Sequence, residues 1–96
     1  MALLTPSEIE ARLHELEGWT YDGSALLKRF VFADFAAAID FMAAARPAID
    51  EFDHHPEWTN VYNRVDVRLN SHDVGGVTGR DFRLARLLDS AYAEPV

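Results

Sequence analysis

The segment DHHPEWTNVYNRVDVRLNSHD, residues 53–73, contains three of the four histidines of the chain. His54 and His55 are adjacent and precede a stretch with β-strand periodicity, and His72 follows that stretch. An imidazole has an unperturbed pKa of about 6.5, so it can donate or accept a proton at neutral pH with little tuning. The three histidines therefore suit acid–base catalysis that moves two protons, with nearby carboxylates fixing their tautomers.

Two other interpretations of the same residues stay open on these grounds. The histidine pair could cap a loop and His72 could be a polar strand end, because a motif is only a hypothesis until its context is known. A zinc site is the second alternative, in which Asp50, Asp53 and Asp73 could add oxygen ligands. Adjacent residues do not easily aim both rings at one ion, and recognised ligand spacings are absent. We therefore expect no bound metal and no cofactor.

Composition excludes several classes of function. The chain has 96 residues, which suits one domain over residues 1–96, and it carries 16 acidic against 9 basic residues. A net charge of −7 repels nucleic acid and anionic membrane surfaces. There is no cysteine for thiolate chemistry, and Gly75-Gly76 lacks the lysine of a phosphate-binding loop. We expect a cytoplasmic protein that binds neither nucleic acid nor membrane.

The first third of the sequence predicts a helix and a hairpin. Residues 5–17 form the helix, with Thr5 as N-cap and Glu8 completing a capping box. Residues 19–32 are rich in β-forming side chains on either side of Asp22-Gly23, which is a turn signal. We expect His14 to be an exposed residue of this helix, and we assign it no role in the function.

A second, alanine-rich helix is predicted from Asp34 to about Phe52. Pro47 lies inside it, and a proline there removes a backbone hydrogen bond, so we expect a kink or break. Pro56 keeps the residue before it out of helical geometry and helps to end the element. The predicted apolar stripe consists of Phe35, Ile39, Phe41 and Met42.

Residues 58–70 alternate with period two, and Tyr62-Asn63-Arg64 could be a turn or bulge that divides them into two strands. One face of this stretch is predicted to hold Val61, Asn63, Val65, Val67 and Leu69. SHDVGG is a loop, and Thr78 with Asp81 three residues on forms a capping box for a last helix. The buried face predicted for this helix consists of Phe82, Ala85, Leu88 and Tyr92.

The element order α-β-β-α-β-β-α predicts an α+β, two-layer fold: a four-stranded antiparallel sheet with three helices on one face. Leu84, Leu87, Leu88 and Ala91 spread over more than half of the last helix, which is too wide for one buried stripe. We therefore expect an exposed apolar helix face and, with a sheet edge to cover, a homodimer or homotetramer.

DHHPEW, NVYNRVDVRL, HDVGGVT and RDFRLA occur in that order, after an LEGW at the end of the first helix. Together these motifs resemble the pterin-4a-carbinolamine dehydratase family over essentially the whole chain. The family dehydrates 4a-hydroxytetrahydropterin to quinonoid dihydropterin during tetrahydrobiopterin recycling, so the resemblance implies a hydro-lyase. It also implies the family's homo-oligomeric assembly.

The resemblance also assigns site residues. It makes His54, His55 and His72 the catalytic histidines and leaves the reaction without metal or cofactor. Asp81 matches the family's acidic residue beyond the glycine loop. The residues expected to bind the pterin are Asp50, Asp53, Trp58 and Asp81. Animal members of the family also stabilise a homeodomain transcription factor dimer through a helical face. The alternative function is therefore a non-catalytic binding role, for which the leucines of the last helix would supply the surface.

Overall fold

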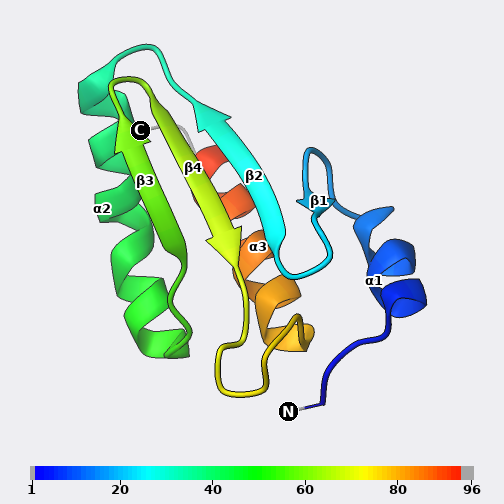
Figure 1. Cartoon of the computed structure of the whole chain (residues 1–96). Coiled ribbons are helices and arrows are strands. Elements are labelled where there is room, and N and C mark those ends of the chain that lie inside the picture. The colour runs from blue at the N-terminus through cyan, green and yellow to red at the C-terminus, as the bar shows by residue number, and fades with distance from the viewer. Residues whose placement is uncertain (1, 94–96) are drawn as a thin grey trace.

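The computed structural model describes residues 2–93, which form three helices and four strands. In chain order these are α1 (Pro6–Leu13), β1 (Thr20–Tyr21), β2 (Leu26–Val31), α2 (Phe35–Phe52), β3 (Glu57–Val61), β4 (Arg64–Leu69) and α3 (Gly79–Ala93). The strands make one antiparallel sheet in the order β1-β2-β4-β3. Figure 1 shows α2 and α3 behind the sheet and α1 beside β1. The predicted α+β fold and element order are confirmed.

The core lies between the sheet and the helices. Phe30 of β2 is buried, and its ring centroid lies 5.0 Å from that of Phe41 in α2. Val65 and Val67 of β4 are buried beside it, and α1 contributes Ile9 to the same cluster. Each element therefore buries one apolar side, which is what holds the two layers together. None of the helices among residues 2–93 is long and apolar enough to cross a membrane.

Helix α1 begins as predicted and ends early. Thr5 Oγ1 accepts from the Glu8 N–H at 3.2 Å, and Glu8 Oε1 accepts from the Thr5 N–H at 2.9 Å. The helix ends at Leu13 instead of residue 17. The next N–H groups, including that of Leu16, bond to carbonyls three residues back, so the chain tightens into turns before Gly18.

Helix α2 is continuous through Pro47, so the break, one of the two predicted outcomes, is wrong, and a kink stays a prediction. The proline removes only the hydrogen bond to the carbonyl of Ala43. Both residues lie on the solvent side of α2, where water can replace that bond. Ala45 and Ile49, on the opposite side, are buried and hold the helix against the core.

The buried stripe of α2 also differs from the predicted one. Phe41 is buried and Met42 is partly buried, as predicted, but Phe35 and Ile39 are exposed. The residues that face the core recur at positions 38, 41, 45 and 49, which is the spacing of one side of a helix. The buried residues of α2 are Ala38, Phe41, Ala45 and Ile49.

A two-residue loop, Tyr62-Asn63, divides the alternating stretch into β3 and β4, with Val61 opposite Arg64. Across such a hairpin, cross-strand partners share a face, so the odd-numbered residues of β4 lie with the even-numbered residues of β3. Trp58 is therefore opposite Val67 on the core side. The prediction that Val61 shares that face is wrong, and Val61 is exposed.

Helix α3 is more deeply packed than the sequence predicts. Phe82, Ala85 and Leu88 are buried as predicted, but Leu84 is also fully buried. The predicted exposed leucine face is therefore wrong, because α3 contacts α2, the sheet and α1 at once. Only two members of that face, Leu87 and Ala91, are partly exposed.

Tyr92 at the end of α3 is 44% exposed, so it is not a buried residue as predicted. Its ring nevertheless packs at 5.0 Å from the Phe30 ring, measured between centroids. Its hydroxyl donates to the Val31 carbonyl at 2.8 Å. The polar end of the side chain explains the exposure, since Tyr commonly keeps its hydroxyl near water.

Candidate active site

The three predicted histidines come from the same end of the sheet. His54 and His55 precede β3, with Pro56 between them and the strand, and His72 lies three residues after β4 ends at Leu69. Because β3 and β4 are antiparallel, with Glu57 opposite Arg68, the start of one strand lies beside the end of the other. The turn at the opposite end of the hairpin thus brings together residues that one unbroken strand would have held far apart (Figure 1).

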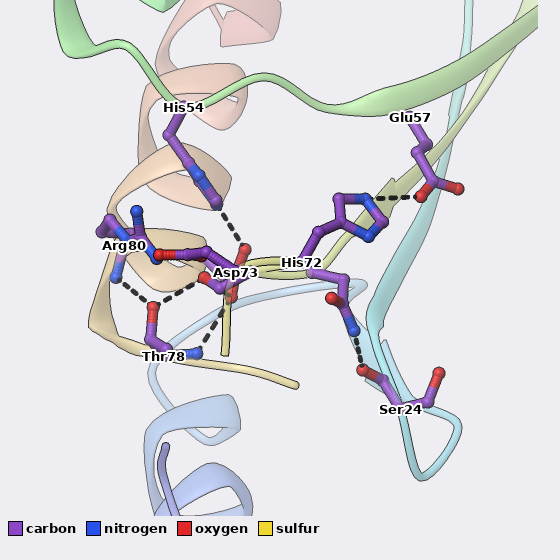
Figure 2. Close-up of polar contacts among 10 residues, drawn as sticks. Ser24, His54, Glu57, His72, Asp73, Thr78 and Arg80 are labelled. Atoms are coloured by element: carbon purple, nitrogen blue, oxygen red, sulfur yellow. Dashed lines mark hydrogen bonds and ion pairs between the residues drawn. The ribbon is translucent and has the colours of Figure 1, made fainter. Parts of the chain in front are cut away.

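His54 is the buried histidine of the site. Its Nε2 lies 2.7 Å from Oδ1 of Asp81, whose side chain is completely buried at the start of α3. The His54 ring also packs edge-on against Phe52, with 6.2 Å between ring centroids. Figure 2 shows the imidazole reaching from the α2–β3 connection toward the carboxylate on α3. Burial strengthens this hydrogen bond, because the effective dielectric constant around it is lower than that of water.

Asp81 accepts two further hydrogen bonds through its other oxygen, Oδ2. The Ser71 hydroxyl and the Thr78 N–H both donate to it, each at 2.9 Å. Of the capping box predicted at the start of α3, the bond from the Thr78 N–H to the Asp81 side chain is present, whereas the Thr78 hydroxyl accepts from the Arg80 N–H instead of that of Asp81. Three donors on one buried carboxylate satisfy it well, which a buried charge requires.

The other two histidines form exposed pairs with carboxylates. His72 Nε2 lies 2.8 Å from Glu57 Oε1, and His55 Nε2 lies 3.1 Å from Asp50 Oδ1. All four side chains are at least half exposed. Exposed pairs of this kind contribute little to stability, so their main effect is on the orientation of the rings.

One feature is common to all three histidines: Nε2 faces a carboxylate in each. At His54 and His55 this contact is a hydrogen bond, in which a carboxylate can only accept and Nε2 is therefore the donor, whereas the contact of His72 with Glu57 has the distance of an ion pair. The nitrogen left to exchange protons with a bound molecule is Nδ1. The arrangement thus directs Nε2 of all three imidazoles at an acidic residue.

The loop that carries His72 is held at both ends. Arg80 of α3 donates to Asp73 Oδ1 at 2.6 Å, and this guanidinium lowers the pKa of the Asp73 carboxyl below its usual value. The preceding Asn70 side chain donates to the Ser24 carbonyl at 2.6 Å (Figure 2). Asp73 is therefore engaged with a cation, which makes it a poor candidate for a metal ligand.

Two of the residues predicted to bind substrate have mainly structural contacts. Asp53 ends α2 with a left-handed backbone (φ 57°), and its N–H donates to the Ile49 carbonyl at 2.9 Å. Trp58 is partly buried on the core side of β3, edge-on to Phe41. Both flank the histidine pair in sequence, and their contacts with a ligand stay predictions.

One hollow on the surface lies next to the site, and another lies between two of the helices. One, of about 770 Å³, opens on the sheet and is lined by Pro56, Glu57 and Trp58 among others. The second, of about 620 Å³, lies between α2 and α3 and is mainly apolar. Neither is lined by a histidine of the site, although the first begins at the residues that follow His55. Within residues 2–93, no group of three or more acidic or histidine side chains is placed to hold a metal ion.

Sequence reasoning missed two residues of this arrangement. Glu57 lies inside the DHHPEW motif, but its partner His72 becomes apparent only from the register of β3 and β4. Ser71 is fully buried, although a serine beside a histidine in a glycine-rich loop is expected to be exposed. In the sequence, only its position next to His72 indicates that Ser71 could belong to the site.

The comparisons with known proteins agree on one family. A sequence model of "Pterin 4 alpha carbinolamine dehydratase" matches residues 2–91. A Rhizobium johnstonii protein named "Putative pterin-4-alpha-carbinolamine dehydratase" is 48% identical over 98 residues, covering 100% of this chain and 97% of its own length. The chain belongs to the pterin-4a-carbinolamine dehydratase family, and the resemblance seen in the sequence is confirmed.

Solved structures agree with this fold. A crystal structure of a "transcriptional coactivator/pterin dehydratase" from Brucella melitensis superimposes with a TM-score of 0.91 at 44% identity, covering 96% of this chain and 100% of the other. A pterin dehydratase-like protein described as a RuBisCO assembly factor of the α-carboxysome gives a TM-score of 0.70 at 21% identity, covering 85% and 98%. At that lower identity the second likeness concerns the fold alone.

Proposed function

We propose that this chain is a hydro-lyase that dehydrates 4a-hydroxytetrahydropterin by histidine acid–base catalysis. The observation that carries the proposal is the buried pair of His54 and Asp81, at the end of the sheet where His55 and His72 also arise. A buried imidazole with one nitrogen fixed by a carboxylate is prepared for proton transfer at the other. Membership of the family supplies the pterin as substrate class.

The reaction needs one proton delivered and one removed. The bond between carbon 4a and its hydroxyl oxygen breaks, and a protonated imidazole gives that oxygen a proton so that water leaves. The neighbouring ring nitrogen loses its own proton to a neutral imidazole, and its electron pair forms the double bond to carbon 4a. The product is quinonoid dihydropterin plus water, so atoms and charge balance without an oxidant or a metal.

We assign the two proton transfers to His54 and His72, acting at Nδ1 of each ring. His55 is assigned to orienting the pterin, together with Asp50, Asp53 and Trp58. Asp81 is assigned to holding His54 in its tautomer, which refines its predicted role as a substrate-binding residue. The direct test is turnover of enzymatically generated 4a-hydroxytetrahydropterin above its uncatalysed dehydration.

We predict that turnover needs no metal ion. Each site histidine already directs Nε2 at a carboxylate, and no cluster of ligands occurs among residues 2–93. Incubation with EDTA followed by gel filtration is expected to leave the rate of dehydration unchanged. A rate that is lost after this treatment and returns with added Zn²⁺ would contradict the prediction.

We also propose a homo-oligomer, a dimer or tetramer. Strand β3 is an edge of the sheet, and unpaired edges are usually covered. Apolar side chains such as Phe35 and Ile39 are exposed on α2, and Val61 is exposed at the end of β3. The charge of −7 per chain opposes association, but a Debye length of about 8 Å at physiological salt screens much of that repulsion.

Light scattering at micromolar concentration tests the assembly. We expect a mass of two or four chains at physiological ionic strength. A mass of one chain that does not change when salt is raised would exclude the oligomer.

The alternative function, non-catalytic binding of a protein partner, stays a prediction, but the leucine surface expected to carry it is mostly buried. Leu84 and Leu88 are buried in the core, so only Leu87 and Ala91 of the predicted face are available to a partner. Both line the apolar hollow between α2 and α3, which is the part of α3 where such a role would have to be sought.

A further inference from the structure

We propose that Ser71 is a positioning residue that connects the loop carrying His72 to the buried pair of His54 and Asp81. The inference rests on the proposed function, because it concerns the same site. Ser71 lies between β4 and α3, is fully buried and makes hydrogen bonds in two directions. Its side chain contacts the carboxylate that holds His54, and its backbone closes the loop in which His72 stands.

The side-chain hydrogen bonds of Ser71 have a defined direction. Its hydroxyl has one proton, which it donates to Asp81 Oδ2 at 2.9 Å, because an ionised carboxylate can only accept. The Thr78 hydroxyl lies 2.8 Å from the Ser71 oxygen and must therefore be the donor of that bond. The Arg80 N–H in turn donates to the Thr78 hydroxyl at 3.2 Å.

These bonds form one chain that ends on the carboxylate of Asp81. Each donor in the chain polarises the next, and a buried network of this kind is strengthened when every member is satisfied. Asp81 then has Oδ2 fixed from one side, and Oδ1 is left to accept from His54 Nε2. The Ser71 hydroxyl and the Thr78 N–H together hold the rotation of the carboxylate, and with it the orientation of the imidazole, and the hydroxyl is the side-chain donor of the two.

The backbone of Ser71 organises the loop of residues 71–76. Its N–H donates to the Gly76 carbonyl at 2.8 Å, and its carbonyl accepts from the N–H groups of Val74 and Gly75 at 3.1 and 2.9 Å. His72 is the next residue in this closed loop, and its ring is directed to Glu57 (Figure 2). One residue therefore sets the position of both proposed proton-transfer histidines.

Two substitutions separate the hydroxyl from the bulk of the side chain. Ser71→Ala removes the donor to Asp81, and Ser71→Thr retains it. Ser90→Ala is the matched control, since Ser90 is an exposed serine of α3 outside the network. We expect Ser71→Ala to lower kcat by roughly tenfold, the effect of losing one hydrogen bond to a charged group. Ser71→Thr should restore at least half of the wild-type kcat, and Ser90→Ala should leave it unchanged.

Nuclear magnetic resonance of ¹⁵N-histidine protein gives a readout that does not depend on turnover. In the wild type we expect His54 to show the Nε2–H tautomer with a slowly exchanging ring proton. In Ser71→Ala that proton should exchange at least tenfold faster than in Ser90→Ala. Circular dichroism at the assay temperature confirms that the compared variants are folded, and the wild-type spectrum alone tests the assigned tautomer if Ser71→Ala does not fold.

The outcomes distinguish this inference from the proposed function. A wild type without turnover but with a protected His54 Nε2–H, lost in Ser71→Ala, would contradict the function and support the positioning role. An active wild type whose Ser71→Ala variant matches Ser90→Ala in kcat and in proton exchange would overturn the role of Ser71. A wild type with the Nδ1–H tautomer at His54 would overturn it as well.

Discussion

Replacing Asp81 by alanine is expected to destabilise the folded chain by about 3 kcal/mol or more, because three buried donors lose their acceptor and an unsatisfied buried group costs about 1–3 kcal/mol. The carboxylate is completely buried and accepts from His54, Ser71 and Thr78. Alanine leaves all three donors without an acceptor inside the protein, and each such loss is unfavourable. Urea unfolding followed by circular dichroism measures the change.

Asp81→Asn separates the effect on catalysis from the effect on stability. The amide retains one oxygen for Ser71 and Thr78 but presents an N–H group to His54, which favours the wrong tautomer of that ring. Turnover is then expected to fall by about 10²-fold or more, within the range for loss of a general acid or base, while the protein stays folded. Asp89→Asn is the control, because Asp89 is a partly buried carboxylate of α3 that contacts Trp19 and Lys28. Equal turnover of the two asparagine variants would contradict the role given to Asp81.

His54→Ala is expected to lower turnover by about 10²–10⁴-fold, the usual range for loss of a general acid or base. His72→Ala should have an effect in the same range, because each histidine is assigned one of the two proton transfers. His55→Ala should mainly raise KM, since that ring is assigned to orienting the pterin. The matched control is His14→Ala, which removes an exposed imidazole at the end of α1, outside the site.

The uncatalysed reaction sets the background rate of this experiment, because a carbinolamine loses water on its own at an appreciable rate. The rates compared are therefore the differences from a sample without protein. If His54→Ala and His72→Ala both stay within about twofold of the wild type, an effect well below the acid–base range, the assignment of proton transfer to these residues is wrong.

Local signals in the sequence predicted most of the fold. The capping pairs Thr5–Glu8 and Thr78–Asp81 lie at the starts of α1 and α3, and Asp34 caps α2. These signals act over three or four residues, so they can be recognised without knowing what the elements pack against. The three histidines could be found in the same way, since chemistry-bearing residues are visible wherever the fold places them.

Features set by packing could not be predicted in this way. The burial of Leu84 depends on α3 having neighbours on several sides, and the continuity of α2 through Pro47 depends on which side faces water. The pairing of His72 with Glu57 depends on the register of β3 and β4. The two-residue loop sets this register by placing Val61 opposite Arg64, so that even-numbered residues of β3 share a face with odd-numbered residues of β4. The resemblance to the family identified Asp81, whereas Ser71 could be identified only from its contacts.

The most direct test of the proposed function is the rate at which 4a-hydroxytetrahydropterin, generated enzymatically in the cuvette, converts to quinonoid dihydropterin with and without this protein. We predict a rate that rises in proportion to the concentration of wild-type protein and is nearly lost in His54→Ala at equal concentration of folded protein. A wild-type rate no higher than that of the sample without protein would contradict the proposed dehydratase activity.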